Sequence, residues 1–380
     1  MKKLTVCFSL LLIFLAYATY NFINILDLFK TIDSTLLQED NCQIIPGYIG
    51  IEDFVEYSDE ILIGGSNNNL KLFTLNNYND TENGNMISFN ISSKQFSIVP
   101  LQKFPSNIAF HPHGIFLFKK EIIYVINHAF DKGGERIEKF RINEREGKIT
   151  NLTYIQSFIL PDTLKGTLND LVALREDEFY FTSSYYTQLD TKNNDVGTVN
   201  KIASLISIAL NTKLTYAYYY YDKKTVQLSN AKGLLLNGIT LNDRFNILYI
   251  CDSLGKTVSI YSINKENHKI IKLIKTLDIG YGCDNLSFDS KTNQVYVTLM
   301  GRTKDFLELS SNYKSTRKLE VKEMYGGIIT ISKLNTFSLS LIFKNKMMSV
   351  SNSIIKNNKL AILSSCVDNG IMICEIGKQK

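Results

Sequence analysis

Residues 236–253 read LNGITLNDRFNILYICDS, and the order of residue types in this stretch decides the fold. A polar residue, Asn237, stands before an apolar run, a polar turn at residues 242–246 and a second apolar run. Short runs rich in Ile, Leu and Tyr that are bounded by Asn and Asp are typical of β-strands. The stretch therefore predicts two consecutive strands, with Asn237 at the entrance of the first.

The same form occurs five more times. The other copies are IEDFVEYSDEILIGG at 51–65, PHGIFLFKKEIIYVIN at 112–127, LNDLVALREDEFYFTSS at 168–184, CDNLSFDSKTNQVYVTL at 283–299 and SNSIIKNNKLAILSS at 351–365. Six such units, unevenly spaced, predict an all-β fold, a six-bladed β-propeller with four strands in each blade. We assign residues 40–380 to this propeller as the catalytic domain. We also expect one or two short extra helices, the first at residues 199–210.

The N-terminus, MKKLTVCFSLLLIFLAYATY at residues 1–20, has two lysines followed by an almost unbroken apolar run. This pattern predicts an apolar helix that acts as an export signal. Residues 16–18, Ala-Tyr-Ala, resemble a cleavage site, whereas residues 22–29 prolong the apolar character. A cleaved signal peptide and a retained signal anchor both fit. In either case we expect a secreted or extracellular protein, anchored to a membrane if the segment stays.

Charge gives little reason to expect a nucleic-acid partner. The chain of 380 residues has a net charge of +5, with 21% charged residues. Its densest basic stretch, residues 314–322, also contains Glu320, and arginine residues do not alternate with aromatic residues there. We therefore expect no nucleic acid among its partners.

Cysteines and glycosylation motifs agree with export. Outside the N-terminal segment the cysteines are Cys42, Cys251, Cys283, Cys366 and Cys374. Cys42 and Cys374 lie near the two ends of the propeller, and an odd number leaves at least one free thiol or an intermolecular bond. We expect Cys283 to be a small buried thiol, with a redox-sensitive gate as the alternative. Asn-x-Ser/Thr motifs predict glycosylation at Asn79, Asn90 and Asn151.

Three pairs of oxygen-bearing side chains stand at predicted strand entrances: Glu52-Asp53, Asn169-Asp170 and Asp284-Asn285. Neighbouring side chains on a strand point to opposite faces, so each pair can serve two sites. Carboxylates and amides without nearby thiolates are ligands for a hard cation, and calcium is the natural candidate. The alternative is that Asn and Asp merely begin strands as turn residues.

In a propeller the innermost strands line a central tunnel. Residues at their entrances converge there, and the candidate ligands are Glu52, Asn169, Asn237, Asp284 and Asn285. Of the four histidines, His113 and His128 bracket one predicted blade entrance and its next strand. They could form a dyad in which one imidazole activates water and the other sets its tautomer. His111 and His268 are expected to be structural or surface residues.

Taken together, these features resemble the paraoxonase/arylesterase family of calcium-dependent lactonases. The matching phrases are NCQIIPGYIGIEDF, HPHGIFLF, YVINHAF, LNDLVAL, LNGITL, CDNLSFD and ILSSCVDNGIMICEI. They follow the family's order and cover roughly residues 40 to 376. Residues 300–327 depart from the family pattern in a region that shapes its substrate pocket, so substrate preference is not implied.

The resemblance implies two calcium ions, one catalytic and one structural. The catalytic ion would be held by Glu52, Asn169, Asn237, Asp284 and Asn285, and the structural ion by Asp53, Asp170 and the carbonyl of Ile115. It implies a catalytic role for His113, His128 and Asp284, with either water or Asp284 as the nucleophile. It also pairs Cys42 with Cys374. Asn285 begins an acceptor motif, but a ligand inside a tunnel should stay unglycosylated.

The expected activity is calcium-dependent hydrolysis of a lactone or aryl ester. One alternative is a gluconolactonase-like or phosphotriesterase-like hydrolase that uses the same tunnel. Another is a non-catalytic propeller that binds a lipid or a protein partner. The helix at 199–210, together with the N-terminal segment, could dock on a membrane or lipoprotein surface, although a simple packing helix is an equal alternative.

Overall fold

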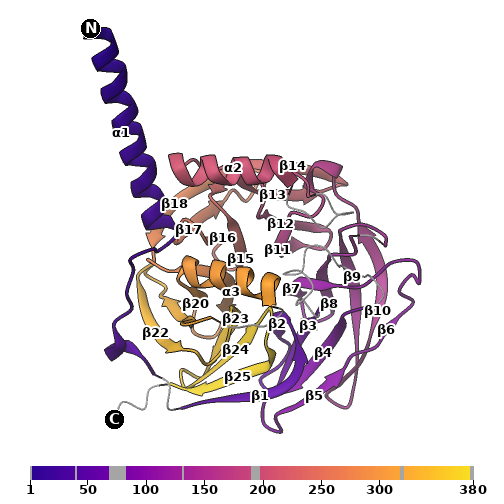
Figure 1. The fold of residues 1–380 in the computed structure, drawn as a ribbon. Coiled ribbons are helices and arrows are strands. Elements are labelled where there is room, and N and C mark those ends of the chain that lie inside the picture. The colour runs from indigo at the N-terminus through magenta and orange to yellow at the C-terminus, as the bar shows by residue number, and fades with distance from the viewer. Residues whose placement is uncertain are drawn as a thin grey trace.

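The computed structural model describes residues 2–38, 41–67, 83–130, 132–189, 197–316 and 321–376. Within these ranges the strands form six sheets arranged as a closed ring, which confirms the predicted six-bladed β-propeller (Figure 1). Neighbouring innermost strands contact each other all the way around the ring. Each copy of the sequence repeat supplies the first two strands of one blade.

The blades follow the chain in order. Blade 1 contains β2 (Ile51–Glu56), β3 (Ile61–Ser66), β4 (Asn85–Asn90) and β5 (Gln95–Ile98). Blade 2 contains β7 (Pro112–Phe118), β8 (Ile122–Asn127), β9 (Arg136–Arg145) and β10 (Lys148–Phe158), with the short β6 (Leu101–Gln102) parallel to β10. Blade 3 contains β11 (Leu168–Arg175), β12 (Glu178–Ser183), β13 (Thr215–Tyr221) and β14 (Lys224–Gly233).

The other three blades repeat this antiparallel order. Blade 4 contains β15 (Leu236–Asn242), β16 (Ile247–Asp252), β17 (Thr257–Ile263) and β18 (Ile271–Asp278). Blade 5 contains β19 (Gly282–Asp289), β20 (Gln294–Gly301), β21 (Tyr325–Ile331) and β22 (Phe337–Lys344). Blade 6 contains β23 (Val350–Lys356), β24 (Leu360–Ser365), β25 (Asn369–Glu375) and β1 (Cys42–Ile49).

The two ends of the chain meet in blade 6. Strand β1 pairs antiparallel with β25, and the register sets Cys42 opposite Cys374. Their sulfur atoms form a disulfide bond, as the family resemblance implied. Because the first and last strands share one sheet, this bond closes the ring covalently. Closure leaves the propeller without an open seam between its first and last blades.

The core lies between adjacent blades, where apolar faces of neighbouring sheets pack together. Strand β15 is buried along its whole length, because it has the tunnel on one side and other blades around it. The interface of blades 2 and 3 is rich in aromatic residues, among which Phe179 and Tyr220 stack with ring centroids 4.7 Å apart. Such packing fixes the inner strands and therefore the side chains at their entrances.

Three α-helices accompany the sheets in the described residues: α1 (Lys2–Ile25), α2 (Gly197–Leu210) and α3 (Thr303–Thr316). Two short 3-10 helices span Ser34–Leu36 and Asp162–Leu164. Helix α2 joins the second and third strands of blade 3, and α3 does the same in blade 5. In an antiparallel blade this connection lies at the end where the innermost strand begins. Both helices therefore lie at the tunnel end that holds the candidate ligands, which we call the mouth.

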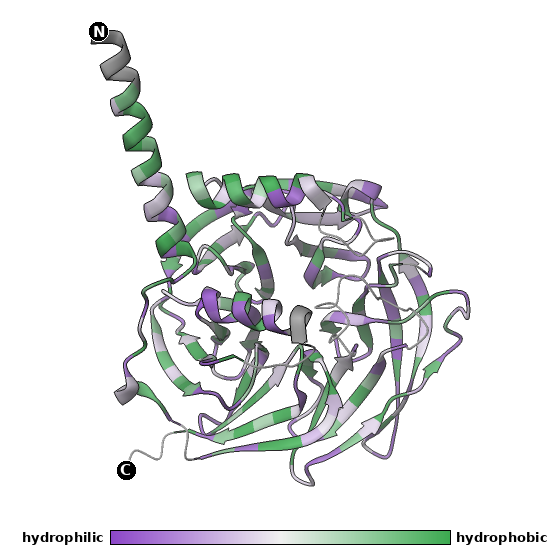
Figure 2. Cartoon of the chain, viewed as in Figure 1, coloured by the Kyte–Doolittle hydropathy of each residue, from purple (hydrophilic) through white to green (hydrophobic). Residues whose placement is uncertain are grey.

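Helix α1 extends away from the propeller, and its base packs against α2 (Figure 1). The amide of Asn21 donates to the carbonyl of Ala209 at 2.8 Å. Residues Phe8–Ile25 are long and apolar enough to cross a membrane, although a signal sequence near the N-terminus has the same properties. Figure 2 shows that apolar residues dominate α1.

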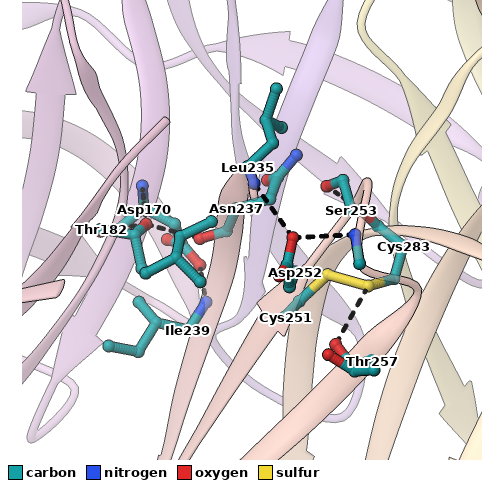
Figure 3. The surroundings of a disulfide bond; sticks show 12 residues. Asp170, Thr182, Leu235, Asn237, Ile239, Cys251, Asp252, Ser253, Thr257 and Cys283 are labelled. Carbon is teal, nitrogen blue, oxygen red and sulfur yellow. Dashed lines mark hydrogen bonds between the residues drawn. A yellow bond between two sulfur atoms is a disulfide. The ribbon is translucent and has the colours of Figure 1, made fainter. Parts of the chain in front are cut away.

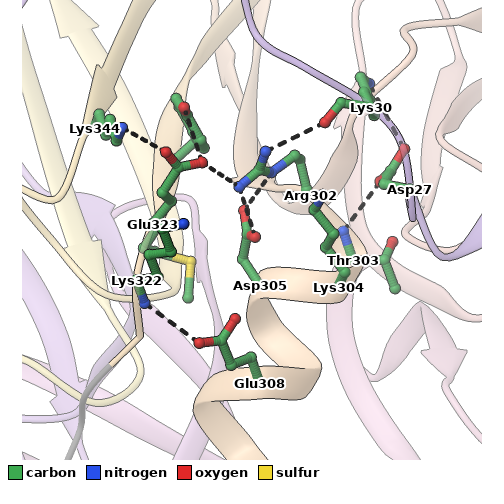
Figure 4. A network of polar contacts seen from close by, with 12 residues as sticks. Asp27, Lys30, Arg302, Thr303, Lys304, Asp305, Glu308, Lys322, Glu323 and Lys344 are labelled. Carbon is green, nitrogen blue, oxygen red and sulfur yellow. Dashed lines mark hydrogen bonds and ion pairs between the residues drawn. The ribbon is translucent and has the colours of Figure 1, made fainter.

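Helix α3 is held at the mouth by a partly buried ionic cluster (Figure 4). Arg302 binds both oxygens of Asp305, at 2.7 and 2.9 Å, and one oxygen of Glu323 at 2.8 Å. Asp27, just after α1, accepts the backbone N–H of Thr303 at 3.0 Å, at the first residue of α3. The segment after α1 therefore contacts the start of α3, although Asp27 and Thr303 are 276 residues apart in the chain.

Candidate active site

The site is built where the innermost strands begin, and two glycines let these strands approach closely. A Cβ atom at Gly114 would lie 2.5 Å from the carbonyl oxygen of Asn169 on the next blade. A Cβ atom at Gly238 would lie 2.5 Å from the backbone of both Asp284 and Asn285. Distances this short exclude any larger residue without a backbone shift. The HPHG and LNGI phrases therefore bring blade 2 to blade 3 and blade 4 to blade 5.

The predicted catalytic-calcium ligands converge in the tunnel. The amide nitrogen of Asn285 donates to Oε1 of Glu52 at 3.1 Å, although these residues belong to blades 5 and 1. Nε2 of His113, from blade 2, lies 3.7 Å from the same Glu52 oxygen. Asn237 hydrogen-bonds to Asp284, so blades 4 and 5 meet there as well. Residues from five inner strands therefore meet or border one another at one end of the ring.

Each of the five candidate ligands has one buried oxygen without a hydrogen-bond partner. These oxygens are Oε2 of Glu52 and Oδ1 of Asn169, Asn237, Asp284 and Asn285. Buried polar atoms without partners are rare, and each calls for an explanation. Five in one place, contributed by two carboxylates and three amides, form an oxygen-lined shell of the kind that binds a hard cation.

The electrostatics of this shell point the same way. Burial and the neighbouring Asp284 raise the pKa of Glu52 well above its usual range, and burial raises that of Asp284 likewise. Two buried carboxylates with no cation at hand resist ionisation. A divalent ion would balance both charges. Among the described residues, no three carboxylate, imidazole or thiol groups cluster as a metal site by themselves, so the amides are needed to complete a shell.

In two of the three pairs the second member, Asp53 or Asp170, is held by backbone N–H groups. Oδ2 of Asp53 accepts the N–H of Ile115 at 2.6 Å, so these two predicted ligands of the structural ion are adjacent. Asp170 accepts the N–H groups of Leu171 and Ile239, at 2.7 and 2.8 Å. Burial raises the pKa of Asp170 to about 7. The pKa of Asp53 rises through burial and the charge of Asp170, so an ion between them would relieve both.

The two predicted catalytic histidines lie together. The rings of His113 and His128 have centroids 4.5 Å apart and are tilted by 47°. Burial, reinforced by His128, lowers the pKa of His113 well below its usual value. A neutral imidazole can accept a proton, so His113 is in the form that a general base requires. His111 is buried near this site, whereas His268 lies at the outer part of the ring, 3.6 Å from Glu178.

Sequence reasoning missed three residues that support the site. Asn352 holds the same place in the sixth repeat, and its amide donates to Asp53 and to the carbonyl of Phe54. Its place in the sixth repeat, equivalent to that of Glu52 in the first, could have identified it from the sequence. Thr182 links the carbonyls of Asp170 and Asn237 through its hydroxyl group. Glu135 lies beside His128, and no sequence pattern marked it.

The expectation of a free thiol at Cys283 is wrong. Cys283 forms a disulfide bond with Cys251 of the neighbouring blade, whereas Cys366 is the free cysteine of the described residues (Figure 3). The two cysteines lie on β16 and β19, which come into contact only when blades 4 and 5 pack together. The bond stands directly before Asp284 and so joins the strand of two candidate ligands to blade 4.

The asparagines of the glycosylation motifs differ in their exposure to solvent. Asn90 and Asn151 are partly exposed on the propeller, and Asn79 lies outside the described residues. Asn285 is buried in the tunnel with 2% of its surface exposed, which supports the expectation that it stays bare. The region at 300–327, expected to differ from the family's pocket loop, contains helix α3.

Comparison with known proteins agrees with this geometry. The sequence model of the family described as Arylesterase matches residues 35–321. Human serum paraoxonase/arylesterase 1 is 26% identical over 270 residues, 68% of each chain. Human serum paraoxonase/lactonase 3 is 27% identical over 191 residues, and this chain spans only about half of its length, 48%.

Solved structures share the fold. A luciferin-regenerating enzyme aligns with a TM-score of 0.51 at 12% identity, covering 88% of this chain and 94% of its own. A gluconolactonase from Xanthomonas campestris aligns with a TM-score of 0.50 at 9% identity, covering 91% and 94%. These identities support the propeller alone. The family match spans most of the chain, and the chain belongs to the arylesterase family, the family of the serum paraoxonases.

Proposed function

We propose that this protein is a calcium-dependent hydrolase of lactones and aryl esters. Membership of the arylesterase family supports a hydrolase of this class. The observation that carries the proposal is the group of five buried, unpaired oxygens beside a neutral histidine pair. A propeller that only binds a partner has no need of such a group, which is destabilising unless an ion binds.

The residues of the tunnel have separate roles. Glu52, Asn169, Asn237, Asp284 and Asn285 would hold the catalytic ion, and Asp53, Asp170 and Ile115 a structural one. Calcium, when bound, supplies positive charge that polarises a carbonyl oxygen and stabilises the oxyanion.

His113 would act as the general base. One O–H bond of a water molecule breaks, its proton passes to a ring nitrogen of His113, and the oxygen forms a bond to the carbonyl carbon. His128, 4.5 Å away between ring centroids, orients His113 and shares the added charge. The proton then returns to the leaving alkoxide as the ester bond breaks. An alternative is that a carboxylate oxygen of Asp284 attacks first, with water releasing the acyl group afterwards.

Hydrolysis of phenyl acetate and of a medium-chain lactone, with and without EDTA, tests the proposal. We expect both activities to disappear with EDTA and to return with calcium. Calcium binding is measured on the same sample by titration calorimetry. Calcium binding without any ester or lactone turnover would favour the non-catalytic propeller. Turnover of a sugar lactone or a phosphotriester alone would favour the corresponding hydrolase.

We further propose that α1 and α2 dock the secreted protein on a membrane or lipoprotein surface. Helix α2 exposes Val199, Ile202, Leu205 and Ile206, and the adjoining α1 exposes apolar side chains along its length. Apolar side chains on two contacting helices favour burial at a lipid interface. Retention of α1 would make this attachment an anchor, and its removal would leave α2.

Flotation with phosphatidylcholine vesicles tests the docking surface. The variant Ile202→Glu with Leu205→Glu should bind vesicles at least several-fold more weakly than the unaltered protein. Leu334→Glu is the control, because Leu334 is even more exposed, 76% against 51% for Ile202 and 56% for Leu205, but lies in the β21–β22 turn at the opposite end of the propeller. Equal binding by all three proteins would contradict the proposal. Mass spectrometry of the secreted protein decides whether α1 is retained.

A further inference from the structure

Glu135 is a buried carboxyl group at the mouth, in the connection between β8 and β9. Its Oε1 atom lies 2.6 Å from Nδ1 of His128. Its Oε2 atom accepts the backbone N–H groups of Gly166 at 2.6 Å and Thr167 at 3.2 Å. With Oε2 held by the backbone, Oε1 in close contact with His128 and only 6% of the residue exposed, the carboxyl group has little freedom to turn.

These contacts join two parts of the site. His128 belongs to the histidine pair of blade 2, whereas residues 166–168 lead directly into β11, whose entrance carries Asn169 and Asp170. A change in the position of Glu135 would therefore move the His128 ring relative to blade 3.

The close contact also limits where hydrogen atoms can lie. A nitrogen and an oxygen 2.6 Å apart repel each other unless they share a proton, and a small rotation of the ring is needed for this, because neither atom has a well-directed hydrogen bond in the structure. Burial raises the pKa of Glu135 to about 8 and lowers that of His128 to about 3, so a pair with no net charge is favoured. With Nδ1 of His128 facing the carboxyl group, exchange of a proton with His113 is left to Nε2.

We propose that Glu135 is a positioning residue, which holds the His128 ring in the orientation and tautomer that His113 requires. Glu135 acts through His128 and needs no contact with the substrate. The inference rests on the proposed function, in which His113 takes a proton from water. A carboxyl group behind a histidine serves the same purpose in catalytic triads and at metal-bound histidines.

The test compares Glu135→Gln, which keeps the shape, with Glu135→Ala and with the exposed control Glu121→Gln. kcat and KM are measured with a medium-chain lactone, and calcium affinity by titration calorimetry. Proton NMR follows the ring signals of the histidines, of which the chain has only four. We expect kcat of Glu135→Ala to fall roughly 10- to 100-fold, with KM and calcium affinity unchanged and the His128 signals shifted. Glu135→Gln should retain most of kcat, because its amide N–H can donate to Nδ1 as the carboxyl O–H does.

Two outcomes would overturn the proposal. Unchanged kcat together with unchanged His128 signals in Glu135→Ala would mean that Glu135 does not orient the ring. A parallel loss of calcium affinity and melting temperature in Glu135→Ala would mean that Glu135 only supports the fold around β11. If the unaltered protein hydrolyses no ester or lactone, the proposed function fails by itself. The His128 signals need no substrate, so they still decide the role of Glu135.

Discussion

The side-chain amide of Asn285 donates to Oε1 of Glu52 at 3.1 Å, and the two residues belong to blades that are not neighbours in the ring. Blade 6 lies between them, so the bond spans the tunnel. Oε2 of Glu52 and Oδ1 of Asn285 are both buried and have no hydrogen-bond partner. The bond therefore presents two oxygens from distant parts of the chain to a common centre.

Replacing Glu52 with Gln should greatly weaken calcium binding. The change keeps the shape but removes one of two negative charges that would balance the ion. We expect calcium affinity to fall at least tenfold and the thermal stabilisation by calcium to shrink. That stabilisation is about 2.7 kcal/mol for a protein whose calcium is at a hundred times its Kd. Calorimetry and melting curves with and without EDTA measure both, and Glu121→Gln should behave as the unaltered protein.

Replacing His113 with Gln should damage catalysis but not calcium binding. The ring supplies a general base, which contributes about 10²- to 10⁴-fold to such reactions. We expect kcat for lactones and aryl esters to fall by a factor in this range, while calorimetry still detects calcium. His268→Gln is the control, because that residue lies at the outer part of the ring. Full lactonase activity in His113→Gln would refute the role of the dyad.

Removal of the Cys251–Cys283 bond should destabilise the mouth of the propeller. The bond closes a loop with a sequence separation of 32 residues, which corresponds to roughly 3 to 4 kcal/mol in the chain-entropy model. We expect the double variant Cys251→Ser with Cys283→Ser to lose stability in urea and to bind calcium more weakly, because Asp284 follows Cys283. Unchanged calcium affinity in a less stable protein would show that the bond serves stability alone.

Replacing Asp27 with Ala should loosen helix α3. The side chain accepts the N–H of Thr303 and forms an ion pair with Lys256, so its loss removes a helix cap and leaves a partly buried lysine without this partner. Loss of a cap of this kind costs about 1 kcal/mol. Hydrogen exchange across residues 303–312 should become faster. Asp162→Ala, at an exposed carboxylate, is the control and should leave α3 protection unchanged.

Asp368 gives a prediction for pH. Burial raises its pKa from 3.8 to about 6. A carboxyl group whose pKa is raised by folding contributes stability at pH below 4, and this contribution is lost as pH rises to about 6. Asp368→Asn removes the charge, so we expect a gain of about 2 to 3 kcal/mol at most at pH 7. Urea denaturation at pH 7 and pH 4 measures it, and a gain that does not shrink at pH 4 would contradict the explanation.

Much of the site could be predicted because the repeat has a fixed phase. Glu52, Asn169, Asn237 and Asp284 hold the same place in four of the six units, and a propeller brings that place to one tunnel whatever the loops do. His113 and His128 were predicted from their position on paired parts of one blade. Asn352 has the same phase but was not predicted as a supporting residue. Its partner is Asp53, a candidate ligand of the structural ion, and the repeat alignment does not show which side chains hydrogen-bond to each other.

The sequence by itself determined the number of blades, the oxygen-bearing residues at their entrances and the apolar N-terminal segment, because alternation and repeat phase are local properties of the chain. Only the tertiary structure decided that Cys283 binds Cys251, that Glu135 faces His128 and that Asp27 caps α3. The disulfide and the Asp27 contact join segments from different blades or elements, and their partners are set by how the sheets pack around the closed ring. Glu135 and His128 share the connection between β8 and β9, and the conformation of that loop against the start of β11 brings them together. No local pattern encodes either arrangement.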